Sequence, residues 1–290
     1  CALPIFKRLT NRHGKLEEET VHVSKVVVKD RIAAQMPKDI EQVGDKGWKL
    51  KQVATGEITM EQFISQLDDV QLEALTRGNQ GAMFCSIGIP GNAAVFGGIN
   101  ADLRYFGIPT MNTNDGPSGN RFQNHTTLMP IMAAIGATWN DDLAHRMCYE
   151  LGKENQAGHS QVMLAPAINM HRNPLCGRNY EYFSEDPYLT GKFGIAYVQG
   201  LQEAGGSACI KHFACNNQEK HRWSGDSIVS QRALREIYLR PFEYCIKMAH
   251  PHWVMTSYNR VNGILNAYNF DLITTILRKQ WGFDGVVMTD

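Results

Sequence analysis

From Gly107 onward, the chain alternates short apolar runs with longer amphipathic segments. A short apolar run bounded by turn residues is typical of a strand covered on both faces, and apolar positions every three or four residues are typical of a helix. The expected strands are 108–111, 134–138, 162–164, 209–213, 254–257 and 286–288, and the expected helices include 140–153, 187–204, 230–248 and 270–281. This alternation predicts a parallel sheet.

Capping residues mark several helix ends. Thr59 and Gln62 have the spacing of a capping box, so a helix is expected to begin there. A second helix is expected over 68–77, with Gly78 ending it. Asn140 suits the N-cap of the helix that follows it.

The number of strand–helix units favours a (β/α)8 TIM-type barrel, an α/β fold, over an open doubly wound sheet. A doubly wound sheet usually carries a glycine fingerprint at its first turn, and no GxGxxG or GxxxxGK[ST] follows a strand in this sequence. We expect residues 59–290 to form the barrel, incomplete at its C-terminal end because no helix follows the last strand. Residues 1–58 are expected to be a linker or the tail of a preceding domain, so that the chain is a piece of a longer polypeptide, truncated at both ends.

Composition and charge exclude several classes of partner. The 29 basic side chains balance 29 acidic ones among 290 residues, so neither nucleic acid nor a membrane surface is an expected partner. The seven cysteines are odd in number and scattered, with no CxxC, which supports neither a disulfide scaffold nor a zinc site. This pattern favours a reducing compartment, and therefore a cytoplasmic location.

Polar side chains cluster where the expected strands end. They are Asp115 and Arg121 after the first strand, Arg178 after the third, Lys211, His212 and Arg222 at and after the fourth, Tyr258 after the fifth and Asp290 after the sixth. The C-terminal ends of barrel strands meet at one mouth, where reacting groups sit. The set therefore predicts a ligand site at that mouth.

Each of these residues also has a structural interpretation. Asp115 begins a good turn, Arg178 has the spacing to pair with Glu181, and residues 184–187 read as a helix start. Lys211 is harder to explain in this way, because a lysine within an apolar strand is costly unless it is paired or functional. It is their position at one end of one sheet that favours a ligand.

The mixture of side chains indicates a sugar. A metal site needs tightly spaced His and carboxylate ligands, and HExxH is absent. A phosphate site needs a glycine-rich backbone nest. A neutral polyol instead needs many fixed donors and acceptors around its rim, as here. No metal and no cofactor are expected.

Five motifs carry a resemblance to the barrel domain of glycoside hydrolase family 3. They are DGPSGNR (115–121), GRNYEYFSEDP (177–187), KHFACNNQEKHR (211–222), MTSYNRVNG (255–263) and GFDGVVMTD (282–290), and their order and spacing also agree. The opening segment, with GDKG and TMEQFISQL, resembles members in which an α/β sandwich domain precedes the barrel.

The resemblance implies a retaining, exo-acting β-glycosidase of the β-glucosidase type, with Asp290 as the nucleophile. The residues that align with the family's sugar-holding positions are Asp115, Arg121, Arg178, Lys211, His212, Arg222 and Tyr258. Asp115 is expected to accept hydrogen bonds from the far hydroxyls of the ring, and Tyr258 to orient Asp290. Lys and Arg side chains near Asp290 are expected to keep its pKa low.

A retaining enzyme also needs a protonated carboxyl, which in the family usually comes from the sandwich domain of the same polypeptide. If it lies in this chain instead, Glu185 and Glu219 are the first candidates. One family branch, acting on N-acetylhexosamine, uses a His-Asp pair after KHF. Residues 214–219 read ACNNQE, which disfavours that activity.

Several alternatives stay open at this stage. The main interpretation is hydrolysis of a β-glucoside or a short β-linked oligosaccharide. A β-xylosidase has a similar site, and a non-catalytic sugar-binding barrel needs no acid. An aldolase that uses Lys211 as a Schiff-base amine is a further alternative. The sequence does not fix the oligomeric state, for which a homodimer is one option.

Overall fold

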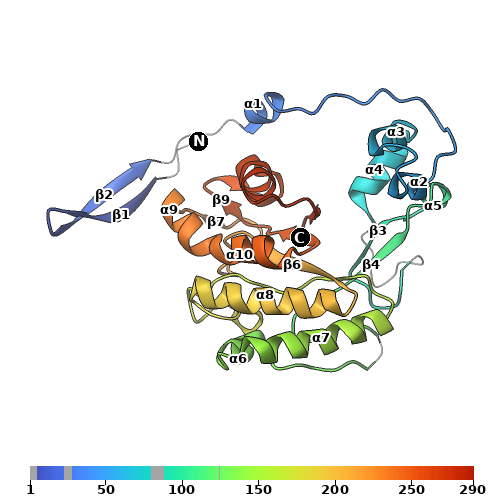
Figure 1. The fold of residues 1–290 in the computed structure, drawn as a ribbon. Helices are drawn as coiled ribbons and strands as arrows, with labels where there is room; N and C mark the ends of the chain where they lie inside the picture. The colour runs from blue at the N-terminus through green and yellow to red at the C-terminus, as the bar shows by residue number, and fades with distance from the viewer. Residues whose placement is uncertain (1–4, 23–27, 80–87, 124) are drawn as a thin grey trace.

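The computed structural model describes residues 5–22, 28–79, 88–123 and 125–290. Its centre is an open six-stranded sheet with the order β11-β8-β6-β5-β4-β3 (Figure 1). The strands are β3 Ala94–Gly97, β4 Thr110–Asn114, β5 Val162–Met163, β6 Ser207–Phe213, β8 Trp253–Thr256 and β11 Val286–Met288. All neighbouring pairs are parallel except β3 with β4. This sheet with its helices is an incomplete β/α barrel, as the alternating pattern predicted.

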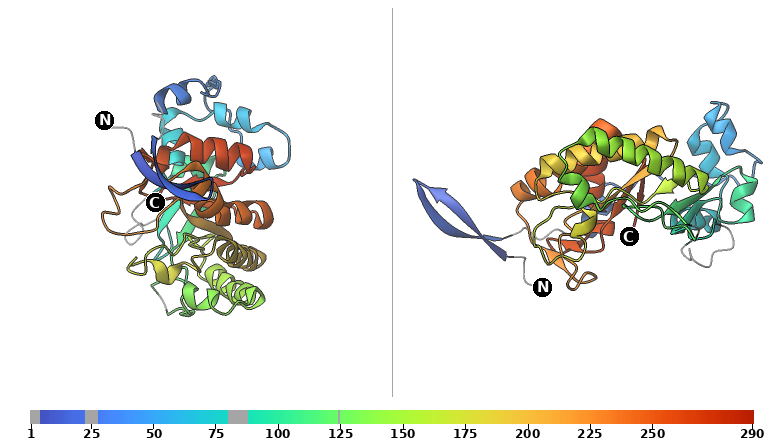
Figure 2. Two further views of the ribbon diagram at one scale, coloured as in Figure 1. Left: turned by 90° about the vertical axis from the view of Figure 1, so that its left-hand side faces the viewer. Right: turned by 90° about the horizontal axis from the view of Figure 1, so that it is seen from below.

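Helices cover one face of this sheet. Figure 2 shows α7 (Asp141–Ala157), α8 (Pro187–Glu203), α10 (Arg240–Ala249) and the π-helix η4 (Asp271–Gln280) following one another along it. A second π-helix, η2 (Leu234–Tyr238), joins the short α9 (Gln231–Ala233) to α10. The main hydrophobic core lies between these helices and the sheet, and includes Ile168, Tyr197, Ile210 and Phe242. The helices thus leave the carboxyl ends of the strands free for a site.

The capping predictions are confirmed. Thr59 caps α3 (Met60–Ser65) through a capping box with Gln62, and α4 (Asp69–Arg77) ends at Gly78. The Asn140 side chain accepts a hydrogen bond of 2.9 Å from the Leu143 amide at the start of α7. These ends follow from local chemistry, which the sequence carries in full.

The prediction of a strand at 134–138 is wrong. Residues Met132–Gly136 form the helix α6 instead. A four- or five-residue apolar run does not separate a strand from a buried helix, and alanine, which occurs twice in this run, is the strongest helix former. The remaining edge of the sheet is β3, which lies in a glycine-rich stretch where no strand was expected.

A second, smaller hydrophobic cluster packs beside the sheet. It joins α2 (Leu50–Ala54), α3, α4 and α5 (Ala101–Tyr105) around buried residues that include Phe63, Leu67, Leu103 and Phe106. Partly buried Trp48, Val53 and Ile58 pack on the same cluster. The division of the chain into 1–58 and 59–290 stays a prediction.

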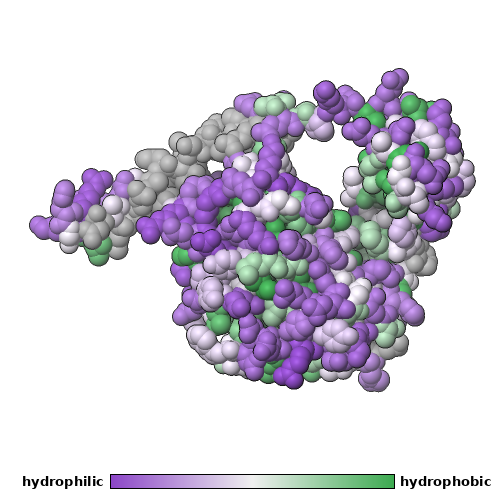
Figure 3. All heavy atoms as spheres, viewed as in Figure 1, coloured by the Kyte–Doolittle hydropathy of each residue, from purple (hydrophilic) through white to green (hydrophobic). Residues whose placement is uncertain are grey.

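The N-terminal residues form an antiparallel hairpin of β1 (Ile5–Arg12) and β2 (Lys15–His22), followed by α1 (Val28–Ala33). Figure 1 shows the hairpin apart from the sheet. The face drawn in Figure 3 is mostly hydrophilic, with hydrophobic residues scattered among charged ones. Within the described residues, every helix is too short or too polar to cross a membrane.

Short elements complete the structure. β7 (Asp226–Ser227), β9 (Arg260–Val261) and β10 (Ile264–Leu265) form a small separate sheet. Two 3-10 turns, η1 (Asn179–Glu181) and η3 (Asn266–Tyr268), lie in the loops after β5 and β8. These loops and the segment after β6 supply most of the polar side chains described next.

Candidate active site

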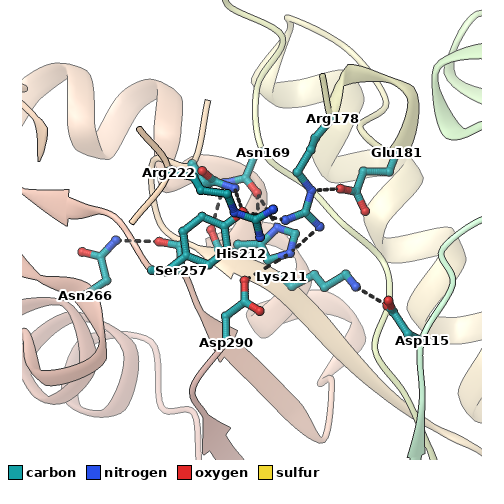
Figure 4. Close-up of polar contacts among 12 residues, drawn as sticks. Asp115, Asn169, Arg178, Glu181, Lys211, His212, Arg222, Ser257, Asn266 and Asp290 are labelled. Atoms are coloured by element: carbon teal, nitrogen blue, oxygen red, sulfur yellow. Dashed lines mark hydrogen bonds and ion pairs between the residues drawn. The ribbon is translucent and has the colours of Figure 1, made fainter. Parts of the chain in front are cut away.

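A pocket of about 830 Å³ lies at the carboxyl ends of the strands. Seven of the eight predicted residues line it: Asp115, Arg121, Arg178, Lys211, His212, Arg222 and Asp290. Tyr258, the eighth, lies beside them and hydrogen-bonds to Arg178. Figure 4 shows the side chains of Arg178, Lys211 and His212 converging between Asp115 and Asp290. The strand ends therefore meet as the barrel argument predicted.

Asp115 is held by two cations at one end of the pocket. Lys211 Nζ donates to Asp115 Oδ1 over 2.7 Å, and an Arg121 guanidinium nitrogen donates to Asp115 Oδ2 over 3.1 Å. Burial works to raise the pKa of Asp115, but Lys211 and Arg121 outweigh burial, so its pKa lies below the usual value. Asp115 is thus an ionised acceptor facing the pocket.

Arg178 connects the centre of the site. Its Nε pairs with the buried Glu181, and its two terminal nitrogens donate to the Tyr258 hydroxyl and to His212 Nε2, each over 2.9 Å. Burial disfavours the charged guanidinium, but Glu181 outweighs burial and raises the pKa of Arg178. Arg178 therefore both pairs with Glu181, as its spacing suggested, and lines the pocket.

His212 is a neutral imidazole. Its Nε2 accepts from Arg178, so the ring proton lies on Nδ1, 3.4 Å from Asn169 Oδ1. Burial, together with the charges of Arg178, Lys211 and Arg222, lowers the pKa of His212 well below its usual value. Its approach of 3.8 Å to Asp290 Oδ2 is consequently a contact between a neutral ring and a carboxyl, rather than an ion pair.

Neighbouring residues of strand β6 both reach the pocket. Side chains alternate in a regular strand, yet Lys211 and His212 both line the cavity. The register between β6 and β8 shifts between Ile210 and Phe213, which marks an irregularity of the bulge type. The Asn169 amide accepts from the His212 N–H and donates to the His212 carbonyl, 2.9 Å each. It satisfies backbone groups that would otherwise be buried without partners.

Asp290 does not have the low pKa that the sequence suggested. Burial raises its pKa above the usual value, and the opposing charges of Lys211, Arg178 and Arg222 do not offset burial. The expectation counted the cations correctly but not the loss of water around the carboxyl, which favours the protonated form. The Asp290 carboxylate is therefore more basic than that of an ordinary aspartate, although the cations Lys211, Arg178 and Arg222 lie near it.

Tyr258 is held by a carboxylate other than Asp290. Its hydroxyl accepts from Arg178 and donates to Glu219, both of whose oxygens lie 3.1 Å away. Glu219 also pairs with Arg222 over 3.3 Å, and the Arg222 guanidinium lies 4.3 Å from the centre of the Tyr258 ring. The hydroxyl thus contacts Arg178 and Glu219, and the expected role of Tyr258 in orienting Asp290 stays a prediction.

The two candidate acids within the chain differ in surroundings. Glu185 is exposed, and its neighbour Asp186 caps α8, with its carboxylate accepting from the Leu189 amide over 2.7 Å. The helix-start interpretation of this segment is confirmed. Glu219 is largely buried and accepts from Asn216, Tyr258 and Arg222. With these donors directed at it, Glu219 is placed to act as a fixed carboxylate.

The sequence did not identify Asn169 or the part of the pocket lining that α4 and β3 supply. Residues in and around α4 and β3 also line the pocket: Leu75, Thr76, Arg77, Asn79, Ala93, Ala94 and Phe96. An amide that supports another residue's backbone carries no sequence signal. This part of the lining depends on long-range packing, which periodicity does not report.

Two observations concern the other kinds of chemistry considered above. Among the described residues, no three His, Cys, Asp or Glu side chains gather as metal ligands. A Schiff-base lysine must present a free amine, but the Lys211 ammonium is nearly inaccessible to solvent and donates to Asp115. The arrangement instead offers fixed donors around a cavity with two carboxyls at its ends.

Known proteins are similar to this chain in sequence and architecture. Residues 92–290 match the family model described as Glycosyl hydrolase family 3 N terminal domain. A β-glucosidase of Ruminococcus albus is 45% identical over 98% of this chain and 30% of its own length. The structure of a β-glucosidase from Paenibacillus barengoltzii superposes with a TM-score of 0.92 at 43% identity, over 99% of this chain and 32% of that one.

A third match holds a ligand. β-Glucosidase 3B from Thermotoga neapolitana, solved in complex with glucose, has a TM-score of 0.72 and 40% identity over 79% of this chain and 33% of its own. The present chain therefore spans about a third of the length of the relatives it matches.

Proposed function

The chain belongs to glycosyl hydrolase family 3, and we propose that the polypeptide containing it is a retaining, exo-acting β-glucosidase. The observation that carries the proposal is the single pocket in which Asp115, Lys211, Arg178, His212 and Asp290 meet. The β-glucosidase relatives at 39–45% identity over nearly the whole chain support the same activity. The substrate is a terminal β-D-glucosyl residue of a glucoside or a short β-linked oligosaccharide.

In this mechanism the far end of the pocket holds the sugar. The ionised Asp115 accepts hydrogen bonds from hydroxyls remote from the reacting carbon, with Lys211 and Arg121 fixing its position. Arg178 and the neutral His212 act on hydroxyls nearer the reacting carbon. Because the imidazole is neutral, it adds no positive charge beside the oxocarbenium-like transition state.

Asp290 is the proposed nucleophile. Its carboxylate attacks the anomeric carbon and forms a glycosyl-enzyme intermediate as the aglycone leaves, and water then releases the sugar. Its raised pKa makes the ionised form more basic than an ordinary aspartate, while Lys211, Arg178 and Arg222 stabilise the carboxylate when it is expelled again. A second carboxyl protonates the leaving group, and we assign it to the sandwich domain of the same polypeptide.

A slow substrate tests this assignment. The complete polypeptide is incubated with 2,4-dinitrophenyl 2-deoxy-2-fluoro-β-D-glucoside, whose intermediate accumulates, and the labelled peptide is identified by mass spectrometry. We expect the label on Asp290, turnover of 4-nitrophenyl β-D-glucoside and its loss in Asp290→Ala, with partial rescue by azide. A label on Glu219 or faster hydrolysis of the β-D-xyloside would contradict the proposal, the latter in favour of a β-xylosidase. Glucose binding with no hydrolysis would indicate a non-catalytic barrel.

We also propose a cytoplasmic location. The described cysteines, Cys148, Cys176, Cys209, Cys215 and Cys245, are free and buried. Burial raises the pKa of the Cys148, Cys209, Cys215 and Cys245 thiols, so these groups stay protonated. Such thiols fit a reducing compartment. Localisation of the tagged polypeptide by fractionation tests this location, and recovery in the medium would contradict it.

We also propose that the polypeptide forms a homodimer. Measurement of its molar mass in solution by light scattering tests this proposal.

A further inference from the structure

Trp223 is a large aromatic side chain left in water beside the pocket. It is 71% exposed. Its ring centre lies 4.9 Å from that of Tyr258, and Arg222, the preceding residue, lies 4.9 Å from its ring. Single exposed hydrophobic side chains are common and need no function. Trp223 differs because its ring contacts Tyr258 and Arg222, two residues of the site.

The contacts place Trp223 near one particular end of the pocket. Asp115 occupies one end with Lys211 and Arg121. At the other end, Asp290 touches His212, which hydrogen-bonds to Arg178, whose guanidinium in turn holds Tyr258. Trp223 contacts Tyr258 and so extends this second chain of contacts outward into solvent. It therefore stands on the Asp290 side, beyond the phenol ring.

That position corresponds to the leaving group. The proposed function puts the far hydroxyls at Asp115 and the anomeric carbon at Asp290, so the aglycone points from Asp290 toward solvent. We propose that Trp223 is the platform on which a ring-shaped aglycone, a second pyranose or an aryl group, packs; this inference rests on the proposed function. The C–H groups on one face of a pyranose carry partial positive charge and meet the negative face of an aromatic ring.

The contacts that Arg222 makes support this role. Arg222 lies 4.9 Å from the Trp223 ring and 4.3 Å from the Tyr258 ring, so one guanidinium contacts both aromatic groups. Glu219 in turn pairs with Arg222 over 3.3 Å. An aromatic ring held in this way loses little conformational freedom when a ligand packs on it. The pocket then selects glucose by polar contacts, and Trp223 selects what is attached to it.

The test compares substrates that share glucose and differ in the aglycone. For the complete polypeptide, kcat/KM is measured on cellobiose and on methyl β-D-glucoside, whose aglycone is too small to stack. The value of kcat/KM covers the steps up to aglycone departure. Its ratio between the two substrates therefore measures how much the contact between Trp223 and the aglycone contributes. In Trp223→Ala the ratio of cellobiose to methyl glucoside is expected to fall about 3- to 10-fold, as for loss of one aromatic contact.

Three variants accompany this measurement. Trp223→Phe should retain most of the ratio, and Trp223→Leu, which keeps apolar volume without a ring face, should lose it. Trp139→Ala is the matched control: Trp139 is 78% exposed and, like Trp223, lies outside the pocket lining, but the contacts with Tyr258 and Arg222 belong to Trp223. An unchanged ratio in Trp223→Ala overturns the proposal. A large fall in Tm with an unchanged ratio also overturns it and assigns Trp223 to packing against the remainder of the polypeptide.

A binding experiment separates this inference from the proposed function. Cellobiose and glucose are titrated calorimetrically into the Asp290→Asn polypeptide, with and without Trp223→Ala. We expect the affinity for cellobiose to fall relative to that for glucose. If the wild-type polypeptide hydrolyses no β-glucoside, the proposed function fails, and this relative affinity still decides the role of Trp223. An equal fall in affinity for both sugars would overturn the proposal that Trp223 binds the aglycone.

Discussion

Replacement of Asp115 by Asn removes the charge of this side chain and keeps its size. Lys211 and Arg121 hold the carboxylate at 2.7 and 3.1 Å, so its remaining lone pairs are available to the pocket. A hydrogen bond to a charged group contributes about 1.5–3 kcal/mol. Two sugar hydroxyls on Asp115 therefore correspond to about 3–6 kcal/mol, or about 10²–10⁴-fold in kcat/KM. Because the side chain is 34% exposed, the lower half of that range is expected.

The assay is kcat/KM of the complete polypeptide on 4-nitrophenyl β-D-glucoside, with thermal unfolding measured in parallel. Stability should also fall, since the buried Lys211 loses its partner at a cost of about 1–3 kcal/mol. Asp186→Asn is the matched control, because Asn caps helix α8 as well as Asp does. If Asp115→Asn loses stability but keeps kcat/KM within about three-fold of wild type, Asp115 only neutralises Lys211 and the assigned contact to sugar is wrong.

Three further substitutions test other parts of the structure. Asp290→Asn should raise Tm at neutral pH: burial raises the pKa of Asp290 on folding, so wild-type stability falls as pH rises above the ordinary ~3.9, and a Tm difference that does not grow with pH contradicts this. Glu181→Gln should lower the unfolding free energy by about 3–5 kcal/mol in urea, since Arg178 stays charged without its buried partner, whereas the exposed Glu185→Gln should not. Asn140→Ala should cost about 1 kcal/mol through loss of the α7 cap, and an unchanged urea midpoint would refute it.

Local chemistry made parts of the fold predictable. Thr59, Gln62 and Asn140 cap helices through hydrogen bonds within three residues, so the sequence contains both partners. The prediction of a strand at 134–138 was wrong because the sequence of a short apolar segment does not determine whether that segment forms a strand or a buried helix. Only the packing of α6 in the folded chain decides that.

The candidate site was also predictable in part: the positions of its residues could be predicted, but their electrostatic states could not. Barrel topology predicted that Asp115, Lys211 and Asp290 would meet, because the chain direction alone determines where strand ends lie. Their electrostatic states were not predictable. Burial determines the direction of the pKa shift of Asp290, and Glu219, distant in sequence from Tyr258, determines where that hydroxyl points. Both depend on distances that the sequence does not contain.

The irregularity in β6 has a consequence for protein engineering. Adjacent residues of an ordinary strand face opposite sides, so a site transplanted onto one would present either Lys211 or His212 inside the barrel, but not both. Anyone grafting this site onto another scaffold must transfer the irregular backbone of residues 210–213 and its supporting Asn169 as one piece. For the same reason, exchanges between family members at this strand should succeed as whole segments and fail as single residues.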